Sequence, residues 1–324
     1  MTSVGVAANG SSGDGPCYVW LDVDCGVDDA LGVMLGVRFN SAIVLGVSCV
    51  YGNVAVEQVG RNVARVLHVC ERPDVPFYLG ASKNILRQER VITDFHGTDG
   101  LGDAAAFEHG QHCPEPKPGS AVLHMIEAVN AHPKQVNVIA TGPLTNIALA
   151  CLLDTEFATN VASVVVMGGA VKSEGNTTPS GEYNMVCDPE AAHICLNSFD
   201  RMVLLPWELM ERHQLDWPVV ERWTSKSSPR SEFMRSILQK CIVAEKARGN
   251  RFIACDPIAV AVALNPRIAT RKSLVHIAVE LQGQLTRGQS VVDWQSILKQ
   301  PSNVELVEEV DLVLFSHMMD EVTD

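Results

Sequence analysis

The sequence predicts an α/β protein in which a parallel sheet is covered by helices on both faces. Apolar strand-like runs alternate with helix-like segments from Cys17 onwards, and 47% of the 324 residues are hydrophobic while only 19% are charged. Strands that are apolar throughout are typical of a parallel sheet buried on both sides. No repeat or break in composition divides the chain. We therefore expect one domain over residues 17–324, preceded by a Gly/Ser-rich disordered leader at 1–16.

The elements follow one another in a regular rhythm. CYVWLDV at 17–23 predicts the first strand, and Asp28–Arg38 predicts a helix with acidic residues in its first turn. Further apolar runs predict strands at 42–50, 75–80, 137–141, 162–169 and 201–206, with helices at 55–70, 120–131, 143–153 and 189–197. Residues 207–250 are helical and more polar, which suggests a cap, and strand-like segments return at 274–282 and 288–294.

Charge and cysteine content exclude several classes of protein. The net charge of −13 argues against a nucleic acid or an anionic membrane as the main partner. The ten cysteines form no C-x-x-C pair and most stand in apolar stretches, as in a reduced, intracellular protein. We see no secretory signal and no apolar run of membrane-spanning length. We therefore expect a cytoplasmic protein without a membrane or nucleic-acid partner.

Four aspartates gather in the segment LDVDCGVDDALGVM at 21–34. Asp22 and Asp24 share one face at the carboxyl end of the first predicted strand, where ligands bind in open α/β sheets. Asp28 and Asp29 begin the next helix, after a turn that Gly26 permits. The four carboxylates are expected to converge, although one of the helical pair could simply cap its helix. Oxygen ligands of this kind favour Ca²⁺ or Mg²⁺.

Two known aspartate motifs fit this segment less well. An EF-hand loop requires an acidic residue at its twelfth position, which is Val33 when counted from Asp22. A Mg²⁺-dependent phosphohydrolase of the haloacid dehalogenase type also ends its first strand in D-x-D. That motif usually continues to Thr or Val where this chain has Gly26, and the chain contains no second D-D pair.

A series of motifs instead resembles the inosine–uridine-preferring nucleoside hydrolases. The segment DVDCGVDDA is similar to the family's N-terminal fingerprint, and the remaining motifs follow in the family's order: VYGN (50–53), HGTDGLG (96–102), ATGPLTNIA (140–148), VVMGGA (165–170), EGN (174–176), EYNMVCDPEAA (182–192), CDP (255–257) and VELQGQLTRGQSVVDW (279–294). The resemblance covers residues 17–295. It implies a Rossmann-like, open, mostly parallel sheet and hydrolysis of the N-glycosidic bond of ribonucleosides in purine and pyrimidine salvage. It also implies a homodimer or homotetramer.

The resemblance also implies a set of site residues. A tightly bound Ca²⁺ would be held by Asp24, Asp29, Asp256 and the carbonyl of Thr141, with a metal-bound water as nucleophile and Asp24 as its general base. Asn53 matches a residue near that water. Residues that match substrate-binding positions are Asp28, His96, Asn176, Glu182, Asn184, Cys255 and Asp256. Without the resemblance, Asn53 and Asn176 read as turn residues, Glu182 as a solvated charge and His96 as a solvated loop residue. Asp188 reads as a helix N-cap.

The part of the site that handles the base departs from the family pattern. Many members carry histidine before the last aspartate, and here that residue is Cys255; the helical region 231–254 also contains no tyrosine. Candidate replacements on the cap are Trp223, Lys246, Arg248 and Arg251. The preference for purine or pyrimidine bases therefore stays open. A nucleoside-binding or sensing protein without turnover also remains an alternative to the hydrolase.

Overall fold

A central sheet organises the fold. The computed structural model describes residues 17–88, 91, 94–104 and 113–324, so the predicted leader at 1–16 lies outside the described residues. Within them, eight strands form one sheet in the order β3-β2-β1-β4-β5-β6-β10-β7. Their bounds are β1 Cys17–Val23, β2 Ala42–Cys49, β3 Phe77–Leu79, β4 Val136–Ala140, β5 Ser163–Met167, β6 Met202–Leu205, β7 Ala269–Val275 and β10 Val304–Val310.

The strand directions confirm the predicted open, mostly parallel sheet. Neighbouring strands from β3 to β10 run parallel, and β7 alone runs antiparallel, along β10. The chain winds outwards from β1 in both directions, first to β2 and β3 and then, after crossing back, to β4, β5 and β6. The order therefore reverses between β1 and β4, and such a switch point opens a crevice at the carboxyl ends of the strands.

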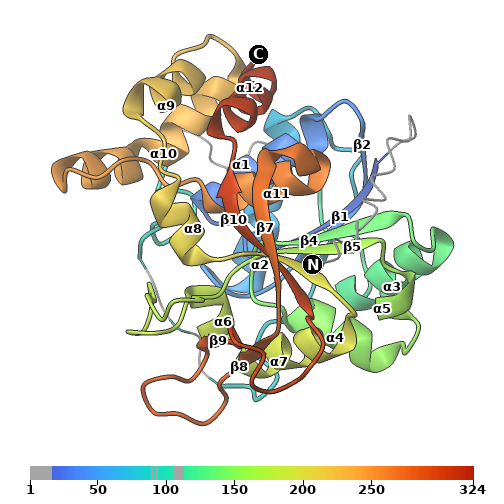
Figure 1. Cartoon of the computed structure of the whole chain (residues 1–324). Helices are drawn as coiled ribbons and strands as arrows, with labels where there is room; N and C mark the ends of the chain where they lie inside the picture. Colours follow the sequence, from blue (N-terminus) through green and yellow to red (C-terminus); the bar gives the residue numbers. More distant parts are fainter. Residues whose placement is uncertain (1–16, 89–90, 92–93, 105–112) are drawn as a thin grey trace.

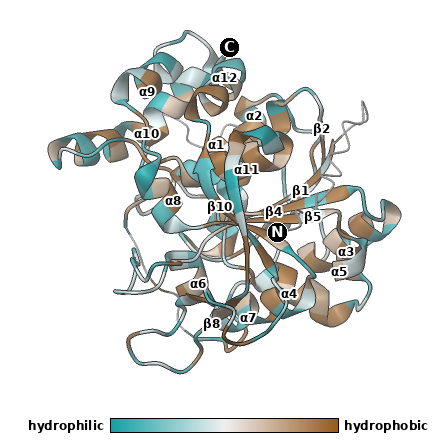
Figure 2. Cartoon of the chain, in the orientation of Figure 1, coloured by the Kyte–Doolittle hydropathy of each residue, from teal (hydrophilic) through white to brown (hydrophobic). Residues whose placement is uncertain are grey.

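Helices cover both faces of this sheet, as the buried strands require. One hydrophobic core lies under α1 (Val27–Arg38), α2 (Val56–Val69), α11 (Cys255–Leu264) and α12 (Leu312–Thr323), and a second lies under α3 (Ala121–Ala131), α4 (Thr145–Leu153), α5 (Phe157–Asn160) and α7 (Pro189–Ser198). Figure 1 shows α1, α11 and α12 on one side of the strands and α4, α5 and α7 on the other. In β1, Leu21 enters the first core and Trp20 the second, so the strand is apolar on both faces. Figure 2 shows the central strands β1, β4 and β5 as mostly hydrophobic.

The predicted helical cap is present as α8 (Trp207–Arg212), α9 (Trp217–Thr224) and α10 (Pro229–Ala247). Figure 1 shows α9 and α10 beside α12, at the end of the molecule where the chain terminates. Proline in the first turn of α9 and of α10 suits the start of a helix, where its missing N–H costs no hydrogen bond. Within the described residues, no helix combines the length and apolar content needed to cross a bilayer.

The strands and helices predicted up to residue 206 all form, with ends shifted by at most two residues. The later strand-like segments correspond to the end of β7 and to a separate antiparallel ribbon of β8 (Ile277–Val279) and β9 (Ser290–Val292). The prediction missed β10, α11 and α12, most of β7, the short helices α5 and α6 (Tyr183–Cys187), and the 3₁₀ turn Pro266–Ile268. All ten cysteines are free, in keeping with the predicted absence of a disulfide framework.

Candidate active site

The candidate site lies at the switch point of the sheet. Asp24 follows the last residue of β1, and Thr141 follows the last residue of β4, the strand that pairs with β1 on the side where the order reverses. Asp28 and Asp29 enter from the first turn of α1, and Asp256 enters from the first turn of α11. Because α1 and α11 pack against each other, the two acidic helix starts meet over the end of β1. The fold thus joins aspartates that are far apart in the sequence.

Three carboxylates form a compact cluster. One oxygen from each of Asp28, Asp29 and Asp256 lies within 4.8 Å of the others, and Asp29 and Asp256 are buried. Burial, and then the neighbouring carboxylates, raise the pKa of Asp256 well above its ordinary range. Burial and the charge of Asp28 also raise the pKa of Asp29. Like charges at this spacing in a buried site need either protons or a cation.

Asp24 adjoins this cluster from below. Its Oδ2 accepts a hydrogen bond of 2.8 Å from the backbone N–H of Asn53, whereas its buried Oδ1 has no partner among the described residues. Burial and the charge of Asp29 raise the pKa of Asp24 well above its usual value. Asp29 Oδ1 accepts from the Thr141 hydroxyl at 2.6 Å, and Asp29 Oδ2 accepts from the Gly26 N–H at 2.9 Å. Asp29 therefore caps its own helix and also faces the cluster.

These donors fit a hard divalent cation. The carboxylates of Asp24, Asp29 and Asp256 offer oxygen atoms only, and one of those oxygens is buried and unpartnered. The Thr141 carbonyl accepts a 2.7 Å bond from the Asn184 side chain, which leaves its second lone pair available to an ion. A cation bound between these carboxylates would offset their mutual repulsion and so favour their ionised forms.

Asp22, the fourth aspartate of the segment, has a different environment. Its Oδ1 accepts hydrogen bonds from the Ser48 hydroxyl and, at 2.8 Å, from the Asn146 amide. Burial raises the pKa of Asp22 to about 7, against the opposing effect of these two donors. Asp22 is thus held through Oδ1 by polar groups of the fold, while its buried Oδ2 has no partner among the described residues. The compact cluster that the structure forms joins Asp28 and Asp29 with Asp256 and not with Asp22.

The turn that carries the cluster works differently from the prediction. Gly26 has an ordinary extended backbone, with φ −79° and ψ −167°, and the positive φ of 20° belongs to Cys25. Glycine is required at position 26 for space, since a Cβ atom there would lie 2.7 Å from Asn53 Nδ2 and 2.8 Å from His96 Nδ1. Those two side chains therefore pack directly onto the turn.

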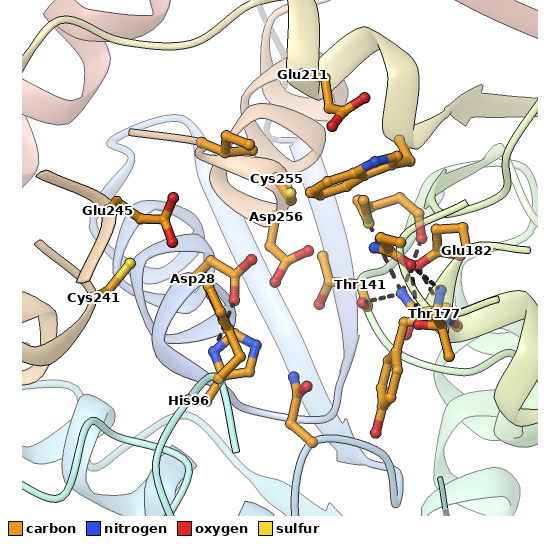
Figure 3. Close-up of a pocket in the computed structure, with 18 of the residues that line it drawn as sticks. Asp28, His96, Thr141, Thr177, Glu182, Glu211, Cys241, Glu245, Cys255 and Asp256 are labelled. Atoms are coloured by element: carbon orange, nitrogen blue, oxygen red, sulfur yellow. Dashed lines mark hydrogen bonds and ion pairs between the residues drawn. The ribbon is translucent and has the colours of Figure 1, made fainter. Parts of the chain in front are cut away.

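His96 lies beside Asp28 without forming an ion pair with it. Its Nδ1 accepts the Val27 N–H at 3.1 Å, so a lone pair occupies that nitrogen and the ring proton belongs on Nε2. The distance of 3.6 Å from His96 Nδ1 to Asp28 Oδ1 is accordingly not a charge-assisted hydrogen bond. Both residues line the cavity described below, as predicted, and Figure 3 shows them together at its edge.

A second group of polar side chains forms the opposite wall. Glu182 is fully buried and caps α6, where its oxygens accept from the backbone N–H groups of Gly169, Asn184 and Met185 at 2.8, 2.9 and 3.2 Å. It is therefore not a solvated loop charge. Asn184 is buried, and exposed Asn176 accepts from the backbone N–H of Tyr183 at 2.9 Å. The predicted N-cap role of Asp188 is also present, in α7.

Between these walls lies a cavity of about 490 Å³. Its inner part is lined by residues that the sequence analysis selected: Asp28, Asn53, His96, Thr141, Asn176, Glu182, Asn184, Cys255 and Asp256. Asp24 and Asp29 lie beneath this surface, fully buried. Its outer part is lined by Trp207 and Glu211 of α8, Cys241 and Glu245 of α10, and the following residues Asn250, Arg251 and Ile253. Figure 3 shows Glu211 and Glu245 beyond Cys255, away from Thr177.

Most of the outer wall was missed by the sequence analysis. Among the candidates on the cap, only Arg251 lines the cavity, and its guanidinium also pairs with Asp216 at 3.2 Å. Trp223 is fully buried in the core against Phe315. Lys246 and Arg248 form ion pairs of 2.8 and 2.7 Å with Glu221 and Glu245. The residue pattern of helices α8 and α10 does not indicate which of their side chains face the cavity.

The sequence is similar to those of known proteins over most of its length. A family model described as inosine-uridine preferring nucleoside hydrolase matches residues 19–317. An uncharacterized protein from Schizosaccharomyces pombe is 33% identical over 298 residues, covering 90% of this chain and 94% of the relative. The pyrimidine-specific ribonucleoside hydrolase RihA of Salmonella dublin is 31% identical over 294 residues, covering 90% and 93%.

Solved structures agree with the sequence relatives. A protein named inosine-guanosine nucleoside hydrolase (IG-NH) superposes with a TM-score of 0.88 at 28% identity, covering 94% of this chain and 98% of that one. The family's enzymes hydrolyse N-glycosidic bonds and depend on a metal, which agrees with the acidic cluster at the switch point. The chain belongs to the inosine-uridine preferring nucleoside hydrolase family and is an enzyme that acts on glycosidic bonds.

Proposed function

We propose that this enzyme hydrolyses ribonucleosides to free base and ribose with the help of bound Ca²⁺. The observation that carries the proposal is the cluster of Asp28, Asp29 and Asp256, within 4.8 Å of one another at the floor of a cavity of about 490 Å³. A cavity of this size is suited to a small molecule such as a nucleoside.

The ligands we propose for the ion are Asp24, Asp29, Asp256 and the carbonyl of Thr141. Their support is the oxygen-only donor set, the unpartnered Asp24 Oδ1 and the mutual repulsion of the buried acids. When bound, Ca²⁺ supplies positive charge that lowers the pKa of water and orients hydroxyl groups of the sugar. The ordinary preference of Ca²⁺ for several carboxylate and carbonyl oxygens favours it over Mg²⁺, which retains more of its own water.

Different residues of the chain act on the water and on the ribose. Asp24, with one free oxygen and the other held by the Asn53 N–H, is oriented to accept a proton from the attacking water. Asp28 and Asn184 hold the 2′ and 3′ hydroxyls, and Asn176 and Glu182 hold the 5′ side. The acidic surroundings favour the positive charge that develops on the ribose as the bond to the base breaks.

A substrate panel tests this proposal. The protein is incubated with Ca²⁺ and either inosine, guanosine, uridine or cytidine, and ribose is measured as reducing sugar. We expect release from at least one nucleoside, and a decrease of at least about 10³-fold in Asp24→Asn, which keeps the side-chain shape but not the base. Nucleoside binding without ribose release would instead identify a sensing protein. Activity on phosphate esters with Mg²⁺ would favour the phosphohydrolase.

Three further proposals accompany the function. We propose that residues 17–324 form one domain, supported by a single sheet that contains both the first strand, β1, and the last strand, β10. We propose a homodimer or homotetramer, which light scattering of the purified protein tests. We also propose a role in purine and pyrimidine salvage in the cytoplasm, for which the ten free cysteines are in keeping with a reducing compartment.

A further inference from the structure

A buried asparagine outside the cavity connects two parts of the proposed active site. Asn62 lies in the middle of α2 and is fully buried, and it does not line the cavity. Its side-chain Nδ2 donates to the backbone carbonyl of Cys25 at 2.9 Å and to that of Asp99 at 2.8 Å. The first carbonyl belongs to the turn before α1, and the second belongs to the loop that carries His96. We call this pair of hydrogen bonds the Asn62 bridge, and the following inference about it rests on the proposed function.

The amide of Asn62 is held in one orientation. Its Oδ1 accepts a hydrogen bond of 2.9 Å from Gln58 Nε2, one helical turn earlier. Because Oδ1 faces this donor, Nδ2 faces the carbonyls of Cys25 and Asp99, which only a donor can satisfy. A Cβ atom at Gly100 would lie 2.8 Å from Asn62 Nδ2 and 3.3 Å from the Cys25 oxygen. The bridge therefore depends on an amide at position 62 and on glycine at position 100.

One end of the bridge fixes the peptide that orients Asp29. The carbonyl of Cys25 and the N–H of Gly26 belong to the same planar peptide unit. That N–H donates to Asp29 Oδ2 at 2.9 Å, while Asn62 binds the carbonyl on the other side of the unit. Because the unit is planar, a rotation that moves the carbonyl also turns the N–H away from the carboxylate. Asn62 therefore helps to fix the orientation of Asp29, which we propose as a metal ligand.

The other end of the bridge, at Asp99, anchors the loop that carries His96. Within this loop the N–H of Gly102 donates to the His96 carbonyl at 2.8 Å, so the loop closes on itself. The His96 ring accepts the N–H of Val27 at 3.1 Å through Nδ1. Val27 is the first residue of α1, where an N–H group has no partner within the helix. Asn62 thus holds the loop where His96 completes the start of α1.

Other contacts of this loop are weaker anchors. Two ion pairs hold it, and both are partly exposed: Arg65 with Asp99 at 3.3 Å and Lys240 with Asp103 at 2.7 Å. Exposed ion pairs contribute little to stability because water and salt screen them. Asn62 is fully buried, and the loss of its amide would leave two backbone carbonyls without this donor. Its removal should therefore affect Asp29 and His96 together.

We propose that Asn62 is a positioning residue for the hydrolysis, joining the turn of the acidic cluster to the loop of His96. Its bond to one carbonyl keeps Asp29 turned towards the proposed cation. Its bond to the other keeps His96 next to Asp28, the residue proposed to hold a ribose hydroxyl, and Figure 3 shows these two side chains together. No covalent bond forms or breaks at Asn62. It acts by holding the two parts of the site in the geometry that the reaction needs.

A substitution that keeps the branched shape but removes the donor tests this role. In Asn62→Leu, the Val27 amide should exchange with solvent at least about tenfold faster than in the wild type, because its bond to His96 weakens. The ¹⁵N NMR spectrum of the His96 ring should change from a single Nε2–H tautomer to a mixture. The Kd for Ca²⁺, measured by calorimetry, should rise by about tenfold. With Ca²⁺ and nucleoside saturating, kcat should fall by about tenfold or more.

Asn303→Leu is the matched control. The Asn303 side chain also donates to two backbone carbonyls, those of Leu196 and Ile277, at 3.0 Å each, and its Oδ1 accepts the N–H of Ile277 at 2.8 Å. These residues belong to α7 and β8 and do not line the cavity. The control should lower Tm, but Val27 exchange, Kd for Ca²⁺ and kcat should stay within about twofold of the wild type.

The outcomes separate this inference from the proposed function. If the wild type releases ribose and Asn62→Leu matches Asn303→Leu in exchange, Ca²⁺ affinity and kcat, the positioning role is overturned and the hydrolase stands. A lower kcat with unchanged Val27 exchange and an unchanged His96 spectrum also overturns it. If Asn62→Leu does not fold, the smaller Asn62→Ala is measured in the same way, and wild-type values overturn the role. A wild type that cleaves no nucleoside overturns the proposed function, and with it any role of Asn62 in the reaction.

Discussion

Replacing Asp256 with asparagine tests whether this side chain is a metal ligand or a structural carboxylate. The oxygens of Asp28, Asp29 and Asp256 lie within 4.8 Å of one another. At that distance and an effective dielectric constant of about 20, each ionised pair repels by about 3.5 kcal/mol. The substitution removes two of the three pairs, or about 7 kcal/mol of repulsion at full ionisation. Without calcium, the variant should therefore be no less stable than the wild type.

With calcium present, the wild type should be more stable than the Asp256→Asn variant. If the site binds Ca²⁺ as proposed, free Ca²⁺ at about 100 times its Kd should stabilise the wild type by about 2.7 kcal/mol, which corresponds to a rise in Tm of about 4 °C for a chain of this length. The variant lacks one carboxylate ligand, so the same calcium concentration should raise its Tm by less than about 2 °C. Thermal melts in EDTA and in Ca²⁺, together with elemental analysis of the purified proteins, give both quantities.

Asp188→Asn is the matched control. Asp188 is also buried, but its oxygens accept from the N–H groups of Ile85 and Ala191 at 3.0 Å and from the Thr145 hydroxyl at 2.6 Å. Its substitution should cost about 1–3 kcal/mol in either buffer. If Asp256→Asn behaves in this way too, or retains a full complement of calcium, Asp256 is not a ligand and the reasoning from the acidic cluster is wrong.

Three other predictions concern the cavity. Cys255→Ser should change kcat for inosine by less than about threefold, because the thiol retains its proton; a large loss on inosine alone would make the thiol the acid. Gly26→Ala should lower kcat/KM by about tenfold or more, since the new Cβ displaces Asn53 and His96; unchanged kinetics would remove their role. 2′-Deoxyinosine should show a kcat/KM at least about 10³-fold below inosine, because the missing hydroxyl leaves polar groups such as Asp28 unpaired. Comparable rates for the two nucleosides would contradict the proposed grip on the ribose.

The floor of the site was predictable because its residues lie in short loops that directly follow strands. Once β1 and β4 are recognised as parallel strands, Asp24 and Thr141 must emerge at the same edge of the sheet. The segment that begins α1 then places Asp28 and Asp29 above them. Asp256 is different, since its approach depends on the packing of α11 against α1, and only the family motif pointed to it.

The outer wall was not predictable on the same grounds. Glu211 and Glu245 lie on helices whose orientation is set by tertiary packing, and neither belongs to a recognisable motif. Trp223 illustrates the opposite error, because a tryptophan proposed for the base pocket is instead fully buried against Phe315. Asp22 was misjudged because the strand pattern shows which face it occupies but not that Ser48 and Asn146 bind it.

The missed strand β10 has a similar explanation. Its sequence VELVEEV carries three glutamates, which obscure the apolar run expected of a strand inside a sheet. The acidic side chains are accommodated by the antiparallel neighbour β7, where Lys272 reaches Glu305 at 2.6 Å and Arg271 reaches Glu308 at 2.9 Å. The charges of β10 are therefore neutralised by β7, which lies about 30 residues earlier in the sequence. The residue pattern of β10 alone does not reveal this pairing.

The late position of β10 in the chain has a consequence for biosynthesis. During translation β6 and β7 leave the ribosome before the strand that fits between them, so both keep an open backbone edge until residues 304–310 have emerged. Unpaired edges recruit other polypeptides, and the nascent enzyme is most exposed to aggregation at this stage. A premature stop codon shortly before residue 304 should consequently yield insoluble product, although every aspartate of the acidic cluster would already have been translated.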